Sequence, residues 1–401
     1  MKIRPIILCG GEGTRLGLKS SNNEPKQFIN FGGWTLIDKT LNRIKAPIFD
    51  YPIISTNKKY LKKVKSFLKK NKFNKYKIIL EPAKKNTAPA VLSAALIHSI
   101  PYKQPLLFLP SDHILEKTNI FNKNLIKYSK YLSKMNIFLF GIKPSHPSKE
   151  YGYLNIKKSL NNLSKVVKFE EKPSKQKAVA LIKKNSLWNS GIFFARKESI
   201  INNFKKFDIK TLKSCYKSIS KAKLIKNVIL LNKKEFLASP SNSFDYAILE
   251  KSSDINSIAL NLPWTDLGNW IEILKIFKIN KSKYFKKKNE FQRPWGKYIN
   301  LFRGNNFLIK ELIVNSKSSI SLQKHNHRSE HWTVTQGKPR ITINKRKFFL
   351  NEKESVHIPL KTIHRIENIY KKPVRIMEAQ IGSILKESDI VRYKDMYGRT
   401  N

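Results

Sequence analysis

The sequence has few cysteines and no long hydrophobic run. Only Cys9 and Cys215 occur among its 401 residues, and they lie far apart, so a disulfide framework is not expected and a reducing compartment fits. The first apolar run, residues 5–9, is broken at once by glycines and is too short for the hydrophobic region of a signal peptide. No run approaches the roughly 20 residues of a membrane-spanning helix. We therefore expect a cytoplasmic protein without membrane insertion.

Acidic residues are also scarce, because 28 Asp and Glu face 79 Lys and Arg and leave a formal charge of +51. Such a surplus usually favours a polyanionic partner. Here the lysines are scattered over the whole length, without the basic arm or the basic and aromatic stripe of nucleic-acid-binding modules. A general drift of surface positions toward lysine explains the charge equally well. We expect anionic small substrates and no specific binding of nucleic acid.

The chain is long enough for two or more domains, and 40% hydrophobic residues predict folded ones. Residues 1–270 alternate short apolar runs with amphipathic stretches, which is typical of an α/β domain with a mostly parallel sheet. Ligands of such sheets bind beyond the carboxyl ends of the strands. Residues 271–292 form a lysine-rich linker. Residues 293–401 alternate Val, Ile, Ser and Thr with polar residues between turns, which predicts a small antiparallel β-domain.

A glycine-rich loop directly follows the first predicted strand. Gly10, Gly11 and Gly13 would let the backbone approach a polyphosphate and point N–H groups at its oxygens, and Arg15 would add a charged fork. An ordinary strand-to-helix turn is the alternative, because short glycine motifs have many false positives. The residues downstream decide between the two interpretations.

Seven further motifs follow in order, and together they are far more specific than the glycine loop. They are Pro25-Lys26-Gln27-Phe28, Glu81-Pro82, Asn86-Thr87-Ala88-Pro89, Leu109-Pro110-Ser111-Asp112-His113, Phe169-Glu170-Glu171-Lys172-Pro173, Trp188-Asn189-Ser190-Gly191 and Trp264-Thr265-Asp266-Leu267-Gly268. With this series the chain resembles the mannose-1-phosphate guanylyltransferase family of sugar nucleotidyltransferases. It resembles in particular the long form, which is fused to a type II mannose-6-phosphate isomerase, and the resemblance covers nearly the whole chain.

The resemblance implies a Rossmann-like, GT-A-type nucleotidyltransferase domain that converts GTP and mannose 1-phosphate to GDP-mannose and pyrophosphate. It implies that the triphosphate and part of the base are held by Gly10, Gly11, Gly13, Thr14, Arg15 and Lys26. The nucleotide pocket would be lined by Glu81, Asn86 and Thr87. The sugar phosphate would lie near Tyr151, Gly152, Tyr153, Glu171, Lys172 and Asn189. Mg²⁺ is implied at Asp112 and Asp266.

The chemistry agrees with these roles. Two carboxylates, expected at opposite ends of the sheet, can chelate a hard cation that bridges phosphate oxygens. Attack of the sugar phosphate on the α-phosphorus needs no protein nucleophile, because in-line positioning and charge neutralisation by Mg²⁺, Arg15, Lys26 and Lys172 lower the barrier. The alternatives are that Asp112 and Asp266 are capping or turn residues and that Lys172 is one more solvated charge.

Histidines gather in the last quarter of the chain. On a strand, His325 and His327 would point to the same face, and with Glu330 and His364 they would make a site for a divalent metal such as Zn²⁺. This pattern resembles the motifs of the cupin barrel in the isomerase half of the same family. His331 is a competing ligand, because the gap before Glu330 is one residue shorter than in most cupins. A cupin that keeps its histidines for packing is the alternative.

Two arginines complete this second site. Arg328 lies inside the motif and is the residue that we expect the isomerase to need most. Arg365 would hold the phosphate of mannose 6-phosphate, or is a surface arginine. The segments Asp389-Ile390-Val391-Arg392 and Tyr397-Gly398-Arg399 also match the family's ending, with no chemistry assigned to them.

This chain departs from the family at several positions. Residues 16–18 read Leu-Gly-Leu where the family has Leu-Trp-Pro, Lys85 replaces an arginine and Cys9 an alanine, and Leu360-Lys361 replaces a glycine-bearing turn. The linker is much shorter than usual, so the homo-oligomeric state cannot be transferred from the family. The main alternatives are a sugar-1-phosphate nucleotidyltransferase with a non-catalytic cupin and a polyanion-binding protein on a relic enzyme scaffold.

Overall fold

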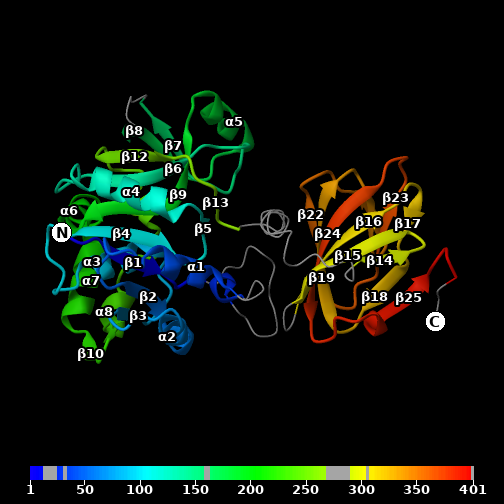
Figure 1. Cartoon of the computed structure of the whole chain (residues 1–401), viewed down its shortest axis with the longest axis horizontal. Helices are drawn as coiled ribbons and strands as arrows, with labels where there is room; N and C mark the ends of the chain where they lie inside the picture. Colours follow the sequence, from blue (N-terminus) through cyan, green and yellow to red (C-terminus); the bar gives the residue numbers. More distant parts are fainter. Residues whose placement is uncertain (12–24, 30–33, 158–162, 268–289, 304–306, 399–401) are drawn as a thin grey trace. The chain divides into compact units, whose positions relative to one another are not determined.

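The computed structural model describes residues 1–11, 25–29, 34–157, 163–267, 290–303 and 307–398. It divides into two compact units (Figure 1). The first unit contains Met1–Gly11 and Leu36–Asp266, and the second contains Glu12–Thr35 and Leu267–Asn401. The structure does not describe residues 268–289, which include most of the predicted linker, residues 271–292. The boundaries at residues 270 and 293 therefore stay predictions.

The first unit is built on an 11-stranded sheet in the order β10-β11-β3-β2-β1-β4-β9-β6-β12-β8-β7. Its strands are β1 (Arg4–Leu8), β2 (Ile53–Asn57), β3 (Lys77–Glu81), β4 (Pro105–Pro110), β6 (Ile137–Ile142), β7 (Tyr153–Ile156), β8 (Leu163–Glu170), β9 (Leu187–Arg196), β10 (Lys223–Ile225), β11 (Val228–Leu230) and β12 (Ile255–Leu260). A separate two-stranded ladder joins β5 (Ile114–Leu115) to β13 (Trp264–Thr265).

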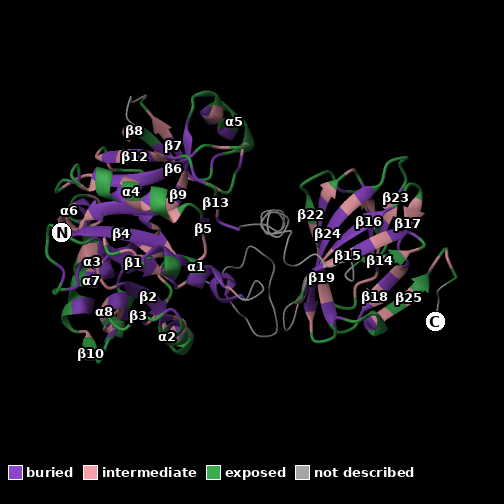
Figure 2. Ribbon diagram, in the orientation of Figure 1, coloured by how far each residue is buried: buried purple, intermediate pink, exposed green. Residues whose placement is uncertain are grey.

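Part of this sheet is parallel, as the sequence predicts. Strands β11, β3, β2, β1 and β4 pair in parallel, as do β6 and β12, whereas β9 runs antiparallel to β4 and β6. Strands β1, β4 and β6 are buried almost throughout (Figure 2), as expected for strands that are covered on both faces. Strand β7 also pairs with β9, so that β9, β6, β12, β8 and β7 close into a ring of pairings.

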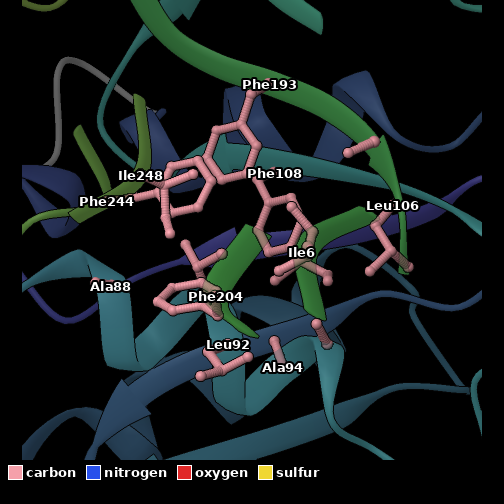
Figure 3. Close-up of a cluster of buried hydrophobic side chains, with 14 of the residues drawn as sticks. Ile6, Ala88, Leu92, Ala94, Leu106, Phe108, Phe193, Phe204, Phe244 and Ile248 are labelled. Atoms are coloured by element: carbon pink, nitrogen blue, oxygen red, sulfur yellow. The ribbon is translucent and has the colours of Figure 1, made fainter. Parts of the chain in front are cut away.

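Helices cover this sheet. Their bounds are α1 (Leu36–Arg43), α2 (Leu61–Lys70), α3 (Thr87–Ala95), α4 (Thr118–Ser129), α5 (Lys175–Lys183), α6 (Lys197–Phe207), α7 (Ile209–Ser220) and α8 (Lys233–Leu237), with short turns η2 (Lys26–Phe28), η3 (Lys58–Tyr60) and the π-helical η4 (Asp245–Leu249). Helices α3, α6 and α7 pack together against the sheet. Figure 3 shows their side chains meeting those of the strands, with Ala88, Leu92 and Phe204 facing Ile6 and Phe108.

Among its described residues, the second unit consists of β-strands and short turns. Its strands are β14 (Glu290–Arg293), β15 (Gly296–Arg303), β16 (Phe307–Val314), β17 (Ser318–Ser319), β18 (Leu322–His325), β19 (Arg328–Gln336), β20 (Arg340–Ile343), β21 (Arg346–Phe349), β22 (Ser355–Ile358), β23 (His364–Asn368), β24 (Val374–Gly382) and β25 (Ile390–Lys394), with the short turn η6 (Glu387–Asp389). They form two antiparallel sheets. Trp332, Val334, Ile341 and Ile376 belong to their common core.

An α/β unit followed by an all-β unit confirms the predicted fold class. None of the helices in the described part of the chain is both long and apolar enough to span a membrane.

Candidate active sites

The glycine loop begins at the carboxyl edge of the first unit's sheet. Strands β1 and β4 pair in parallel with Leu8 opposite Pro110, so Gly10 and Asp112 emerge at the same edge. A Cβ atom on Gly10 would lie 3.7 Å from Oε1 of Glu81, and one on Gly11 would meet nothing within 4 Å. The loop therefore starts beside Glu81 and faces open space. Gly13, Thr14 and Arg15 lie outside the described residues.

Glu81 ends β3 at this edge and is buried. The Ser55 hydroxyl donates a hydrogen bond of 2.7 Å to its Oε1. Burial raises the pKa of Glu81 to about 7, although the bond from Ser55 acts in the opposite direction. Near neutral pH this carboxyl can therefore either accept or donate a hydrogen bond, which suits the edge of a purine base as well as a hydroxyl.

Asn86 and Thr87 begin α3 next to this carboxyl. Asn86 has φ +65° and caps the helix, because its side chain accepts a 2.9 Å hydrogen bond from the Thr87 N–H. The Thr87 hydroxyl accepts the N–H of Phe244 at 2.8 Å, and Lys85 donates to the carbonyl of Ser239 at 2.9 Å. In the structure these residues tie α3 to the segment before η4.

Asp112 and Asp266 come from distant parts of the sequence to one corner of the first unit. Thr265 pairs with Ile114 across the β5–β13 ladder, so Asp266 and His113 continue as neighbours. His113 Nε2 lies 3.7 Å from Oδ1 of Asp112. The Tyr151 hydroxyl donates a 2.9 Å hydrogen bond to Oδ1 of Asp266 and thereby fixes that carboxylate. Two carboxylates in one corner offer the hard oxygen ligands that Mg²⁺ prefers.

The residues assigned to the sugar phosphate form a second group. A Cβ atom on Gly152 would lie 2.6 Å from Oε2 of Glu171 and 2.9 Å from Cζ of Phe169, so a larger residue there would displace these side chains. Lys172 Nζ is 3.1 Å from Oε1 of Glu171, and its backbone has φ +45°. Two hydrogen bonds hold Asn189 in this group. Its backbone N–H donates to the Gly152 carbonyl at 2.8 Å, and its side-chain amide donates to Oδ1 of Asp245 at 3.2 Å.

Asp245 is a residue of this group that the sequence analysis missed. It begins the π-helical η4, a conformation that is often found at functional sites. Burial, followed by the nearby charge of Glu171, raises its pKa to about 7. Ser243-Phe244-Asp245 has the composition of an ordinary helix start, so no signal in the sequence distinguished it.

Lys26 lies in η2 and is buried together with Gln27 and Phe28. This segment groups with the second unit by its contacts. Its role toward a nucleotide therefore stays a prediction.

A buried cluster in the second unit could hold a metal ion. One ligand atom each from His325, Glu330 and His364 lies within 4.8 Å of the others. His325 Nε2 is 3.0 Å from Oε1 of Glu330, and His364 Nε2 is 3.6 Å from its Oε2. All three side chains are almost fully buried.

Hydrogen bonds orient both imidazoles toward the carboxylate. The Nδ1 of His325 is 3.3 Å from the carbonyl of Asp389, and that of His364 is 2.8 Å from the carbonyl of Thr362. A carbonyl can only accept, so each Nδ1 carries the proton and each neutral ring turns the lone pair of Nε2 inward. His364 Nε2 has no hydrogen-bond partner. Convergent lone pairs and a carboxylate fit a divalent cation.

His327 does not belong to this cluster. The prediction that it shares a face with His325 is wrong, because β18 ends at His325 and the exposed residues 326–327 form a bend. The alternation of a strand therefore stops one residue too early. His331, the competing ligand, instead pairs with His357 across β19 and β22, with ring centroids 6.2 Å apart.

Arg328 and two neighbours hold the carboxylate of Glu330. Arg328 Nε donates to its Oε1 at 3.2 Å, Gln380 donates to the same oxygen at 3.1 Å, and the Trp332 indole donates to Oε2 at 3.1 Å. Burial raises the pKa of Glu330, but its electrostatic and hydrogen-bond interactions with His325, His364 and Arg328 outweigh burial and hold the pKa well below its usual range. Burial lowers the pKa of His364 to about 4.

A pocket that is partly open to solvent adjoins the cluster. Its lining includes Gln323, Arg328, Glu330, Glu378 and Gln380. Burial and the neighbouring Glu330 raise the pKa of Glu378 to about 7. Within the described residues Arg365 is not part of this lining, and its Nε donates to the carbonyl of Ile320 at 3.1 Å.

Comparison with known proteins adds two family matches. Residues 4–283 match the Nucleotidyl transferase family, and residues 280–395 match the Mannose-6-phosphate isomerase C-terminal family. Together the matches span both units.

The chain is also similar to curated proteins over its whole length. It is 30% identical to the xanthan biosynthesis protein XanB of Xanthomonas campestris and 29% identical to the mannose-1-phosphate guanylyltransferase of Escherichia coli, each with 99% of both chains covered. It is 29% identical to the alginate biosynthesis protein AlgA of Pseudomonas fluorescens, with 99% of this chain and 97% of that protein covered. The XanB alignment runs over 466 positions, more than the 401 residues present here, so that relative carries insertions.

Solved structures support the same fold. A Thermus thermophilus protein described as mannose-1-phosphate geranyltransferase has a TM-score of 0.60 and 25% identity over 69% of this chain and 79% of that one. A Helicobacter pylori mannose-6-phosphate isomerase has a TM-score of 0.58 and 27% identity over 66% of this chain and 100% of that one.

Proposed function

The chain belongs to the nucleotidyl transferase family and ends in the C-terminal domain of mannose-6-phosphate isomerases, and from this premise we propose that it makes GDP-mannose. It is an enzyme, a mannose-1-phosphate guanylyltransferase, that joins GTP and mannose 1-phosphate in the first unit. The second unit interconverts mannose 6-phosphate and its ketose isomer. The observation that carries the transferase assignment is the β5–β13 ladder, which supports a shared role for Asp112 and Asp266.

In the transferase reaction an oxygen of mannose 1-phosphate forms a bond to the α-phosphorus of GTP, the bond to the bridging oxygen breaks, and pyrophosphate leaves. Gly10, Gly11, Gly13 and Thr14 present backbone N–H groups to the triphosphate, and Arg15 and Lys26 offset its charge. Glu81, with Asn86 and Thr87 beside it, faces the base. Glu171, Lys172 and Asn189 position the sugar phosphate in line.

Asp112 and Asp266 would hold Mg²⁺. When bound, it would neutralise charge that develops between the α-phosphate and the leaving pyrophosphate. Tyr151 supports this role, because its hydroxyl keeps one oxygen of Asp266 in place.

Product identification tests the transferase. The purified protein, incubated with GTP, mannose 1-phosphate and Mg²⁺, should release pyrophosphate and GDP-mannose in equal amounts, as measured by anion-exchange chromatography. Asp266→Asn should lower the rate on the order of 100-fold or more, because one charged ligand is lost. No product from the unaltered protein, or faster turnover with another nucleoside triphosphate or sugar 1-phosphate, would contradict the assignment.

In the second unit, His325, Glu330 and His364 would hold a divalent metal, for which we propose Zn²⁺. The amide of Gln323, 3.5 Å from His325 Nε2, is the nearest further group that could contribute a ligand. When bound, the metal would polarise the carbonyl and hydroxyl oxygens of the sugar during the aldose–ketose exchange. Arg328 orients Glu330 and faces the pocket, and Trp332 and Gln380 fix the same carboxylate.

Metal content tests this site. His325→Ala should lose the bound metal, measured by mass spectrometry of the elements, and His327→Ala should keep it, because His327 lies in the exposed bend. Equal loss from both variants would place His327 among the ligands.

One observation favours the alternative of a non-catalytic second unit. Glu330 already accepts hydrogen bonds from Arg328, Trp332 and Gln380, which would allow the cluster to remain packed without metal. An isomerase assay of the unaltered protein and of Arg328→Ala separates the two proposals. Isomerase activity that Arg328→Ala abolishes supports the bifunctional enzyme.

We place these reactions in the cytoplasm. Cys9 and Cys215 are both buried and neither forms a disulfide, which supports a reducing compartment.

A further inference from the structure

The pocket of the second unit is lined by four cationic side chains, Arg293, Lys310, Arg328 and Arg392. Three of them already have acidic partners. Arg293 pairs with Glu387, Lys310 Nζ lies 3.7 Å from Oε2 of Glu378, and Arg328 Nε lies 3.2 Å from Oε1 of Glu330.

Arg392 differs from the other three. Among the residues that the structure describes it makes no hydrogen bond or ion pair, and its Nε is buried without a partner. A buried donor that lacks an acceptor costs free energy of folding. A ligand in the pocket that accepts a hydrogen bond from Arg392 would remove this cost.

The strand pairing aims Arg392 at the metal cluster's side of the pocket. Arg392 on β25 is the register partner of Gln323 on β18 (Figure 1), and directly opposed residues of an antiparallel ladder project from the same face. Gln323 lies 3.5 Å from Nε2 of His325. The free guanidinium and the metal cluster therefore share one pocket.

From this arrangement we propose that Arg392 binds the phosphate group of the isomerase substrate, a hexose 6-phosphate. A guanidinium fork matches two phosphate oxygens, so Arg392 holds the phosphate end while the cluster faces the carbonyl end of the sugar. Glu330, Glu378 and Glu387 are the acidic groups of the pocket, and their pairing with Arg328, Lys310 and Arg293 limits their repulsion of the phosphate. Arg365, the arginine chosen from the sequence, takes no part. The inference rests on the isomerase activity proposed above and adds its anion-binding residue.

Steady-state kinetics of the full chain test the inference. In Arg392→Ala the KM for mannose 6-phosphate should rise about 10- to 100-fold, since one or two charge-assisted hydrogen bonds are lost, while kcat falls much less. The inhibition constant of inorganic phosphate against the isomerase should rise in parallel. Arg392→Lys keeps the charge but not the fork and should give an intermediate KM. Arg346→Ala, an exposed arginine on β21, is the matched control and should leave KM unchanged.

Further measurements distinguish a loss of phosphate binding from misfolding of the variant. Metal content and guanylyltransferase activity should be unchanged in Arg392→Ala, and a loss of either together with isomerase activity would indicate misfolding instead. Calorimetric titration with inorganic phosphate should show that Arg392→Ala loses a binding event that Arg346→Ala keeps, and this result would stand even if the unaltered protein had no isomerase activity. An unchanged KM and phosphate inhibition in Arg392→Ala, or a larger effect in Arg365→Ala, would overturn the inference.

Discussion

Three buried carboxyl groups, Glu81, Asp245 and Glu378, have pKa values of about 7 because burial disfavours their charged forms. Each lies beside a residue proposed for substrate or metal, and a carboxyl that is half protonated near neutral pH can exchange hydrogen-bonding roles with a ligand. Carboxyl groups with raised pKa values are expected to gather at functional sites, where burial of a titratable group lowers stability but serves binding or catalysis.

Glu81 should make the stability of the first unit depend on pH. Its pKa rises from 4.5 to about 7 on folding, so the folded state binds the extra proton in this window and stability falls as pH rises through it. The loss is at most about 3 kcal/mol at pH 7 and above. Glu81→Gln should remove this dependence, as measured by scanning calorimetry of the unliganded protein from pH 4.5 to 7.5. Ser55→Ala should leave it in place, and parallel pH profiles for Gln and Glu at position 81 would contradict the burial argument.

Tyr151 should act through Asp266. Tyr151→Phe removes the hydroxyl that fixes Oδ1 of Asp266, so guanylyltransferase kcat/KM should fall about 10-fold at limiting Mg²⁺ and less at saturating Mg²⁺. Mg²⁺ titration of the initial rate measures this difference. Tyr131→Phe, a half-exposed tyrosine, is the control. An equal loss at all Mg²⁺ concentrations would mean that Tyr151 contacts the sugar and does not position the carboxylate.

At the scale of strands and helices, the sequence predicted where ligands would gather but not all of the geometry. The burial of β1 and β4 follows from their short apolar runs, and the position of Gly10 and Asp112 beyond the carboxyl ends of these strands follows from the parallel sheet, so both could be predicted. The bend after His325 could not, because alternation alone does not say where a strand stops. Asp245 and Gln323 were missed for another reason: their roles come from partners that are distant in the sequence, such as Glu171 and Arg392.

The bend after β18 depends on a close backbone contact. A Cβ atom on Gly382, at the end of β24, would lie 2.0 Å from the carbonyl oxygen of His327 and 2.6 Å from Cα of Arg328. Gly382→Ala should therefore push β19 away, destabilise the second unit by about 3 kcal/mol or more and abolish metal retention. Scanning calorimetry and metal analysis measure both effects. Gly398→Ala, where a Cβ would meet nothing within 4 Å, should cost about 1 kcal/mol because of its positive φ and keep the metal.

At the scale of the whole molecule, the two units contain separate chemical sites with different demands for metal. The carboxylate pair of the first unit suits an exchangeable hard cation that arrives with the nucleotide. The buried histidines of the second unit suit a resident ion whose release requires local opening. The net charge of the whole chain, +51, is consistent with substrates that all carry phosphate.

Chelation should separate the two activities. After exhaustive dialysis against a strong chelator, addition of Mg²⁺ alone should restore guanylyltransferase activity but not isomerase activity, which should require Zn²⁺ or another transition ion. The calorimetric transition of the second unit should shift to lower temperature in the chelated protein, because bound metal stabilises only the folded state. Full recovery of the isomerase with Mg²⁺ alone, or an unshifted transition, would contradict a resident metal.

The ring of pairings formed by β9, β6, β12, β8 and β7 has a consequence for how this protein behaves when concentrated. Because β7 turns back and pairs with β9 through Tyr153 and Leu154, β7 is not a free edge strand, whereas the opposite side of the large sheet ends in β10, whose Leu224 and Ile225 are exposed. Strand addition to this large sheet would thus find its entry at β10. Lysines 221, 223 and 226 surround that entry, and their mutual repulsion between copies disfavours the first step toward aggregation.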